Sequence, residues 1–189
     1  DDVRLMPKDS LLAWLELYTW PYEAKFKNKD YSLKRSHLFR DELLQVGTLG
    51  GAVYGSIHGH TVDHALSHFV GEFIVGNVLM TQNSPDYLIQ SKAKAKSLIK
   101  SLSKKYKQDY AITPRFAPTT CPEVMSFGAS QAKLNKSFIQ THLSETENEI
   151  DYVLSIFKNI KGFEKVKTYT EIYKKCGLLS SRTIMGHGI

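Results

Sequence analysis

The sequence has few cysteines and no long hydrophobic run, and both absences narrow the class of protein. Cys121 and Cys176 are its two cysteines, and thiols so far apart in sequence indicate neither a disulfide framework nor a zinc knuckle. No window approaches the roughly 20 consecutive apolar residues that a membrane-spanning helix needs. Residues 1–4, DDVR, show neither the basic nor the apolar region of a signal peptide. We therefore expect a reduced, cytoplasmic protein without a membrane partner.

The net charge of the sequence is positive, but it does not indicate a nucleic-acid partner. The net charge is +6 over 189 residues, and the excess lies mainly between Lys92 and Lys107. Apolar residues alternate there with lysines at helical spacing, as in the solvated face of an amphipathic helix: these are Leu88, Ile89, Leu98, Ile99 and Leu102. No aromatic residues are interleaved to stack on bases. With 42% hydrophobic and 23% charged residues, the chain has the composition of an ordinary globular domain.

Strand and helix patterns alternate along the chain. Short apolar runs predict strands over 50–57, 75–80, 109–116, 137–143 and 181–189. Amphipathic stretches predict helices over 10–27 (with Ser10 as N-cap), 31–46, 60–73, 92–107, 122–134, 149–160 and 168–179. No hairpin signal such as Asn-Gly separates them, and repeated βα units imply a parallel sheet. A doubly wound sheet and a closed barrel both fit this alternation.

Polar residues follow three consecutive predicted strands. Arg115 and Phe116 end one strand, His142 and Glu145 follow the next, and His187 ends the last. Ligands of parallel α/β proteins bind at the carboxyl ends of the strands. An imidazole suits zinc or iron, and a nearby carboxylate that is not a ligand can move protons. The alternative is a hydrogen-bonded structural histidine and an arginine paired with a surface carboxylate.

A second histidine group lies on the helix predicted over 60–73. His60, His64 and His68 are spaced by four residues, and His58 precedes them. The spacing would suit a metal, but only Asp63 offers a further ligand nearby, and a motif without its context is weak support. We interpret these histidines as pointing outward from a crossover helix.

Several segments are particular enough to resemble a known family, the guanine deaminases of the amidohydrolase superfamily. The resemblance rests on ITPRFAPT at 112–119, THLSE at 141–145, GHGI at 186–189, LLAWLELYTWPYEAKF at 11–26 and MTQNSPDYL at 80–88. The H-x-x-E and H-G-I elements are shared by many amidohydrolases. The R-F-A-P-T and N-S-P-D-Y-L elements are more particular to the guanine branch.

The resemblance implies an α/β fold, a partial (β/α)8 TIM barrel comprising about strands 2 to 6. Residues 1–189 would be the central segment of a metal-dependent hydrolase barrel. The family's first strand with its H-x-H ligands would precede residue 1, and the late strand with its metal-binding Asp would follow residue 189. The small β-domain would also lie outside, so the segment alone is expected to be inactive.

The resemblance also implies a role for each strand-end residue. His142 would bind one zinc (or iron) ion, Glu145 would shuttle protons, and His187 would orient or deprotonate the nucleophilic water. Arg115 and Phe116 would hold the purine, beside His142 and Glu145. The intact enzyme would hydrolyse guanine to xanthine and ammonia in guanine catabolism, within cytoplasmic purine metabolism. A homodimer is compatible with this reading.

Two other functions remain open on the sequence. An amidohydrolase barrel of this kind could instead deaminate another aminated heterocycle, such as a pterin, a pyrimidine or a triazine. A non-catalytic α/β interaction module would show the same alternation without binding a stoichiometric metal.

Overall fold

The computed structural model describes residues 11–189, so the N-cap expected at Ser10 lies outside the described residues. Five parallel strands form one sheet in the order in which they occur in the chain. All five match strands that the sequence predicts. They are β1 Gly50–Gly55, β2 Glu72–Leu79, β3 Ala111–Pro114, β4 Phe138–Leu143 and β5 Thr183–His187.

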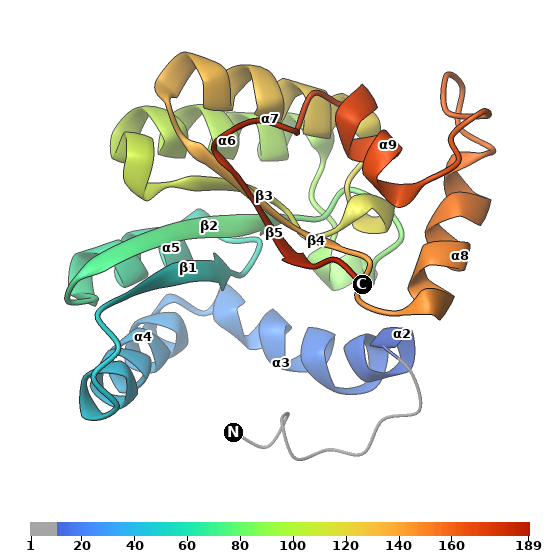
Figure 1. The fold of residues 1–189 in the computed structure, drawn as a ribbon. Helices are drawn as coiled ribbons and strands as arrows, with labels where there is room; N and C mark the ends of the chain where they lie inside the picture. Colours follow the sequence, from blue (N-terminus) through green and yellow to red (C-terminus); the bar gives the residue numbers. More distant parts are fainter. Residues whose placement is uncertain (1–10) are drawn as a thin grey trace.

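Helices connect the strands and cover the sheet. In Figure 1, α6 and α7 lie above the sheet, and the helices from α2 to α4 lie below it. The helices are α2 Leu11–Trp14, α3 Trp20–Ala24, α4 Lys29–Gln45, α5 Gly59–His68, α6 Lys92–Tyr106, α7 Pro122–Asn135, α8 Glu147–Phe157 and α9 Tyr169–Lys175. A π-helical turn, Leu15–Thr19, joins α2 to α3, and short 3₁₀ helices occur at Lys25–Lys27, Asp86–Leu88, Lys107–Asp109 and Ala117–Thr119.

Pro21 explains the π-helical turn inside the first helical stretch. Proline has no backbone N–H, and its ring collides with the carbonyl four residues earlier in a regular helix. The wider turn over Leu15–Thr19 comes directly before this position. Prolines and π-helical turns are both recognised positions at which a helix changes direction.

The sheet curls strongly enough to bring β1 within reach of β4. The side-chain Nε2 of Gln140 in β4 donates to the carbonyl oxygen of Val53 in β1 at 2.9 Å and to Thr113 Oγ1 in β3 at 3.1 Å. Two strands lie between β1 and β4, so this bond crosses the concave side. Sequential strand order and this curvature identify a partial (β/α) barrel rather than a doubly wound sheet, whose strand order would reverse.

Two groups of buried apolar residues hold the layers together. The larger fills the space between the sheet and its helices, with Val62, Val75, Ile99, Ile112 and Tyr173 among its members. The smaller lies at the carboxyl ends of the strands and attaches the 11–27 helical stretch there; it consists of Leu15, Trp20, Ile57, Val78, Met80, Leu88 and Phe116.

The predicted element boundaries needed one clear correction. The helix expected over 60–73 ends at His68, and Glu72 and Phe73 already belong to β2. Gly71 has a φ of +117°, a conformation open to glycine, and it turns the chain into the strand. A Cβ at Gly71 would collide with the carbonyl of Leu49.

Two further expectations are confirmed, the amphipathic lysine-rich helix and the unpaired cysteines. The lysine-rich helix α6 buries Ala95, Ile99 and Leu102, so it is amphipathic. Both cysteines are buried as free thiols. Within residues 11–189, every helix is too short or too polar to cross a bilayer.

Candidate functional site

The end of β3 supplies Arg115 and Phe116. The Arg115 guanidinium forms an ion pair with Glu23 of α3, and both side chains are largely buried, at 14% and 12% exposure. Its Nη1 also lies 3.8 Å from Met80 Sδ. Phe116 is 4% exposed and belongs to the apolar group that attaches the 11–27 stretch. Both residues are therefore held from two sides, by β3 and by the covering helices.

His142, near the end of β4, has a defined orientation. Its Nδ1 lies 2.7 Å from the carbonyl oxygen of Arg115. A carbonyl only accepts, so Nδ1 carries the proton and Nε2 of the neutral ring keeps a free lone pair. Burial lowers the pKa of His142 below its ordinary 6.5, which favours this neutral form. A histidine fixed in this way by a backbone carbonyl is suited to bind a metal through Nε2.

Glu145 and His187 lie next to His142. His187 Nε2 is 3.5 Å from a carboxylate oxygen of Glu145. The rings of His142 and His187 stack with centroids 5.5 Å apart at 23°, because β4 and β5 pair with Leu143 opposite His187. Both strands end in unusual backbone: Ser144 has a φ of 52° and His187 a φ of 67°. Positive φ at non-glycine residues is uncommon and is enriched at functional sites.

All five predicted site residues line one cavity of about 340 Å³. Its lining residues are Leu11, Trp14, Leu15, Tyr54, Arg115, Phe116, His142, Glu145, Glu149 and His187. The convergence expected from the strand ends is thus present, whereas the role of each residue remains a prediction. The volume suits a small, flat heterocycle with a few polar contacts.

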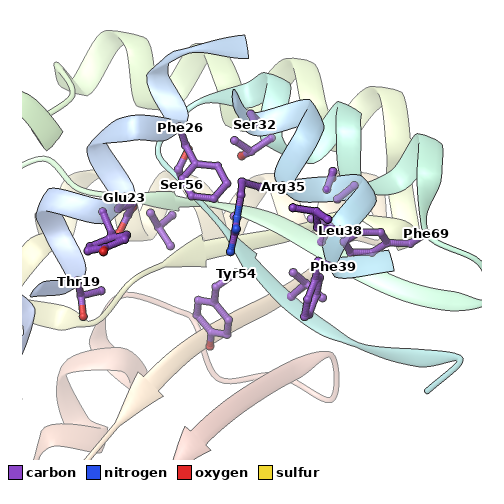
Figure 2. A pocket seen from close by; sticks show the side chains of 18 of the residues that line it. Thr19, Glu23, Phe26, Ser32, Arg35, Leu38, Phe39, Tyr54, Ser56 and Phe69 are labelled. Atoms are coloured by element: carbon purple, nitrogen blue, oxygen red, sulfur yellow. The ribbon is translucent and has the colours of Figure 1, made fainter. Parts of the chain in front are cut away.

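A second cavity of about 440 Å³ adjoins the first and shares Tyr54, Arg115 and His142 with it. It lies between α3 and α4 on one side and β1 and β2 on the other. Figure 2 shows Arg35 of α4 pointing toward Tyr54 across this space. The three shared residues separate the two hollows at the carboxyl ends of the strands.

Tyr54 is a site residue that the sequence did not indicate. It is the next-to-last residue of β1, and its ring centroid lies 4.5 Å from that of His142. Burial, together with Tyr173, raises its pKa well above the ordinary value, so the hydroxyl stays protonated. The available signal was an aromatic with a polar tip near the end of the run GGAVYGSI, which by itself reads as core.

Two buried tyrosines of α9 fix the backbone behind the site. The amide of Ala117, directly after Phe116, donates to the hydroxyls of Tyr169 at 3.2 Å and Tyr173 at 3.0 Å. The Tyr173 hydroxyl donates to the carbonyl of His142 at 2.7 Å. These hydrogen bonds therefore fix the distance between the ends of β3 and β4. No local motif indicates this, because Tyr173 is 31 residues from His142 in the sequence.

The histidines of α5 lie elsewhere and face a neighbouring helix. His64 Nδ1 lies 3.1 Å from Ser32 Oγ of α4, and His60 Nε2 lies 2.8 Å from the carbonyl of Phe26. The interpretation that they point outward was wrong, because α4 packs on this face and half-buries them. Across the described part of the chain, no three His, Cys, Asp or Glu side chains are grouped to hold a metal ion.

Comparison with known proteins confirms the resemblance to guanine deaminases. The chain is 34% identical over 187 residues to the guanine deaminase of Escherichia coli K12, covering 95% of this chain and 41% of that protein. It is 32% identical over 186 residues to that of Dictyostelium discoideum, covering 94% and 40%. No family model matches the chain. The chain thus spans about 40% of the length of these curated relatives.

Solved structures give the same result. E. coli guanine deaminase superposes with a TM-score of 0.85 at 32% identity over 95% of this chain and 42% of that one. Guanine deaminase of C. acetobutylicum, solved with guanine in its active site, gives 0.80 at 33% identity over 94% and 43%. A zinc-complexed atrazine chlorohydrolase of Arthrobacter aurescens shares the fold, with a TM-score of 0.76 at 16% identity over 95% and 43%.

Proposed function

We propose that these 189 residues form the central part of a guanine deaminase, an enzyme that hydrolyses guanine to xanthine and ammonia. The observation that carries the proposal is the convergence of Arg115, Phe116, His142, Glu145 and His187 on one cavity. The similarity to guanine deaminases over almost the whole chain adds to it. As the relatives are more than twice as long, the activity is that of the full-length protein.

His142 fits the first requirement of a zinc or iron site. Its Nε2 is free because Nδ1 donates to the Arg115 carbonyl, and burial favours the neutral ring. A catalytic zinc site takes three protein ligands and keeps one open position. Residues 11–189 offer no group of three ligands, and we expect the full-length protein to supply the others. The bound metal would supply a nucleophilic water at neutral pH.

The remaining residues fit the binding of a purine and the transfer of protons. Arg115 would present its fork of donors to the polar edge of guanine, which a lysine would do less well, and Phe116 would contact the ring. Glu145, 3.5 Å from His187, would carry a proton to the ring nitrogen and then to the departing ammonia. His187 would orient or deprotonate the attacking water.

The wider setting of this activity is also a proposal. We expect a cytoplasmic enzyme of purine catabolism, and two buried free thiols are compatible with a reducing compartment. Homodimer formation and the lack of nucleic-acid binding stay predictions. Gel filtration of the full-length protein and a DNA-binding titration would test them.

The direct test is ammonia release by the full-length protein. We expect turnover of guanine, stoichiometric metal, and inactivity of residues 1–189 expressed alone, because most of the proposed metal ligands would lie outside these residues. A pterin, a pyrimidine and a triazine should react far more slowly. Preference for one of these rings would support a related amidohydrolase instead. A full-length protein without metal or turnover would favour an interaction module.

A further inference from the structure

The motif Thr-x-x-Glu begins two helices of the chain, α8 and α9. The hydroxyl of Thr146 accepts from the amide of Glu149 at 3.2 Å, and that of Thr168 accepts from the amide of Glu171 at 3.2 Å. Each glutamate then turns back and accepts from the amide that precedes the cap. These bonds, Glu145 N to Glu149 Oε2 and Lys167 N to Glu171 Oε2, are both 2.7 Å.

The two glutamates differ in their surroundings. Glu171 is partly exposed and lies in the first turn of α9, which is the usual setting of a helix-capping glutamate. Glu149 is only 2% exposed and lines the cavity that holds the predicted site. Its second oxygen, Oε1, is buried and accepts no hydrogen bond from the described residues. Capping alone does not require this burial, because Glu171 caps α9 from the surface.

The amide that Glu149 holds belongs to Glu145, the proposed proton shuttle. The segment between β4 and α8 is short, and Ser144 takes a φ of 52° within it. The Glu145 carboxylate lies 3.5 Å from Nε2 of His187. Its position therefore depends chiefly on where its backbone is fixed. A hydrogen bond from an amide to a carboxylate is among the stronger ones in proteins.

We propose that Glu149 is a positioning residue for the deamination, which holds the backbone of Glu145 so that its carboxylate faces the substrate. This inference rests on the proposed function. It predicts a defect in turnover rather than in the binding of metal or guanine, because Glu149 acts through Glu145 and not on His142 or Arg115.

The test compares Glu149→Ala, Glu149→Gln and the matched variant Glu171→Ala in the full-length protein. We expect Glu149→Ala to lower kcat about 10- to 100-fold, by analogy with the loss of a group that orients a metal ligand. KM for guanine and bound metal should change little. Glu149→Gln should recover most of kcat, since an amide oxygen still accepts from Glu145. Glu171→Ala breaks the same bond at the N-terminus of α9 and should lower kcat far less than Glu149→Ala does.

Amide exchange followed by mass spectrometry tests the contact without relying on turnover. Exchange in the peptide containing Glu145 should accelerate in Glu149→Ala and be restored in Glu149→Gln, whether or not guanine is the substrate. An inactive wild-type protein would thus contradict the proposed function, but the amide-exchange comparison would still test the contact between Glu149 and Glu145. The positioning role is refuted if amide exchange at Glu145 is unchanged in Glu149→Ala, or if that variant alters only KM or the metal content. It is also refuted if Glu149→Gln does not recover kcat, or if Glu171→Ala lowers kcat as much as Glu149→Ala.

Discussion

The ion pair between Glu23 and Arg115 should stabilise the folded protein more than an ordinary surface ion pair does. It joins α3 to the end of β3, and the side chains of Glu23 and Arg115 are only 12% and 14% exposed. Removing one partner of a fully buried pair costs about 3–5 kcal/mol, because the other charge is left without compensation. With about an eighth of each side chain still exposed, we expect Glu23→Ala to destabilise the protein by about 2–3 kcal/mol.

A double-mutant cycle measures this pair directly. Glu23→Ala, Arg115→Ala and the double variant would be unfolded in urea and followed by tryptophan fluorescence, since Trp20 is 8% exposed and lies three residues from Glu23. We expect a coupling energy of about 2 kcal/mol, with the double variant more stable than the sum of the single losses implies. Glu23→Ala should also raise KM for guanine, because Arg115 loses its anchor.

The exposed pair Lys92–Glu123 is the control for this cycle. Its nitrogen and oxygen are 2.7 Å apart, but the side chains are 56% and 53% exposed, so water screens the pair and no measurable coupling is expected. The reasoning would be refuted if the stability losses of Glu23→Ala and Arg115→Ala added up to that of the double variant within about 0.5 kcal/mol. The two residues would then be neighbours without energetic dependence.

Three further predictions concern the site and its frame. Glu145→Gln in the full-length protein should keep its metal, measured by atomic absorption, and lose at least about 100-fold in kcat; loss of metal would contradict a shuttle role. Gly76→Ala would place a methyl group in collision with Thr113 Oγ1 and the Ala111 carbonyl. It should therefore lower the free energy of unfolding, measured by urea denaturation, by about 1–3 kcal/mol. An unchanged value would mean that β2 and β3 can move apart to make room. Burial lowers the pKa of His58 from 6.5 to about 4. Between these two pH values the unfolded protein binds a proton at His58 and the folded protein does not, so the free energy of unfolding decreases as the pH falls from 6.5 toward 4. His58→Gln should reduce this decrease, and identical pH profiles of the unfolding free energy in the two proteins would contradict the prediction.

The elements of the fold could be read from the sequence because their signals are local. Every expected strand is present, and α6 buries the apolar face that its spacing predicts. Curvature is not a local property. It depends on contacts such as Gln140 to Val53, which are 87 residues apart, and residue patterns alone left barrel and open sheet undecided. The end of α5 was misplaced because Phe69 and Phe73 continue its apolar spacing, whereas Gly71 breaks the backbone between them.

The site was predictable where the chain itself brings residues to strand ends. Arg115, His142 and His187 lie at or directly after the carboxyl ends of parallel strands, so their meeting is a consequence of topology. Glu23, Tyr54 and Tyr173 reach the site through elements that are remote in sequence. Glu149 was hidden for another reason: its Thr-x-x-Glu motif looks like that of Glu171, and only burial distinguishes the two.

Arg115 connects the two proposed halves of the chemistry through its own backbone and side chain. Its carbonyl fixes the tautomer of His142 at 2.7 Å, while its guanidinium, paired with Glu23, lines the cavity proposed for guanine. One residue at the end of β3 would therefore set the distance between the imidazole proposed to bind the metal and the guanidinium proposed to bind the substrate. The amide of the next-but-one residue, Ala117, is held by Tyr169 and Tyr173, so this spacing is set by α9. Since a misplacement of about 1 Å can cost about 100-fold in rate, the buried hydroxyls behind the site matter to the chemistry without touching the substrate.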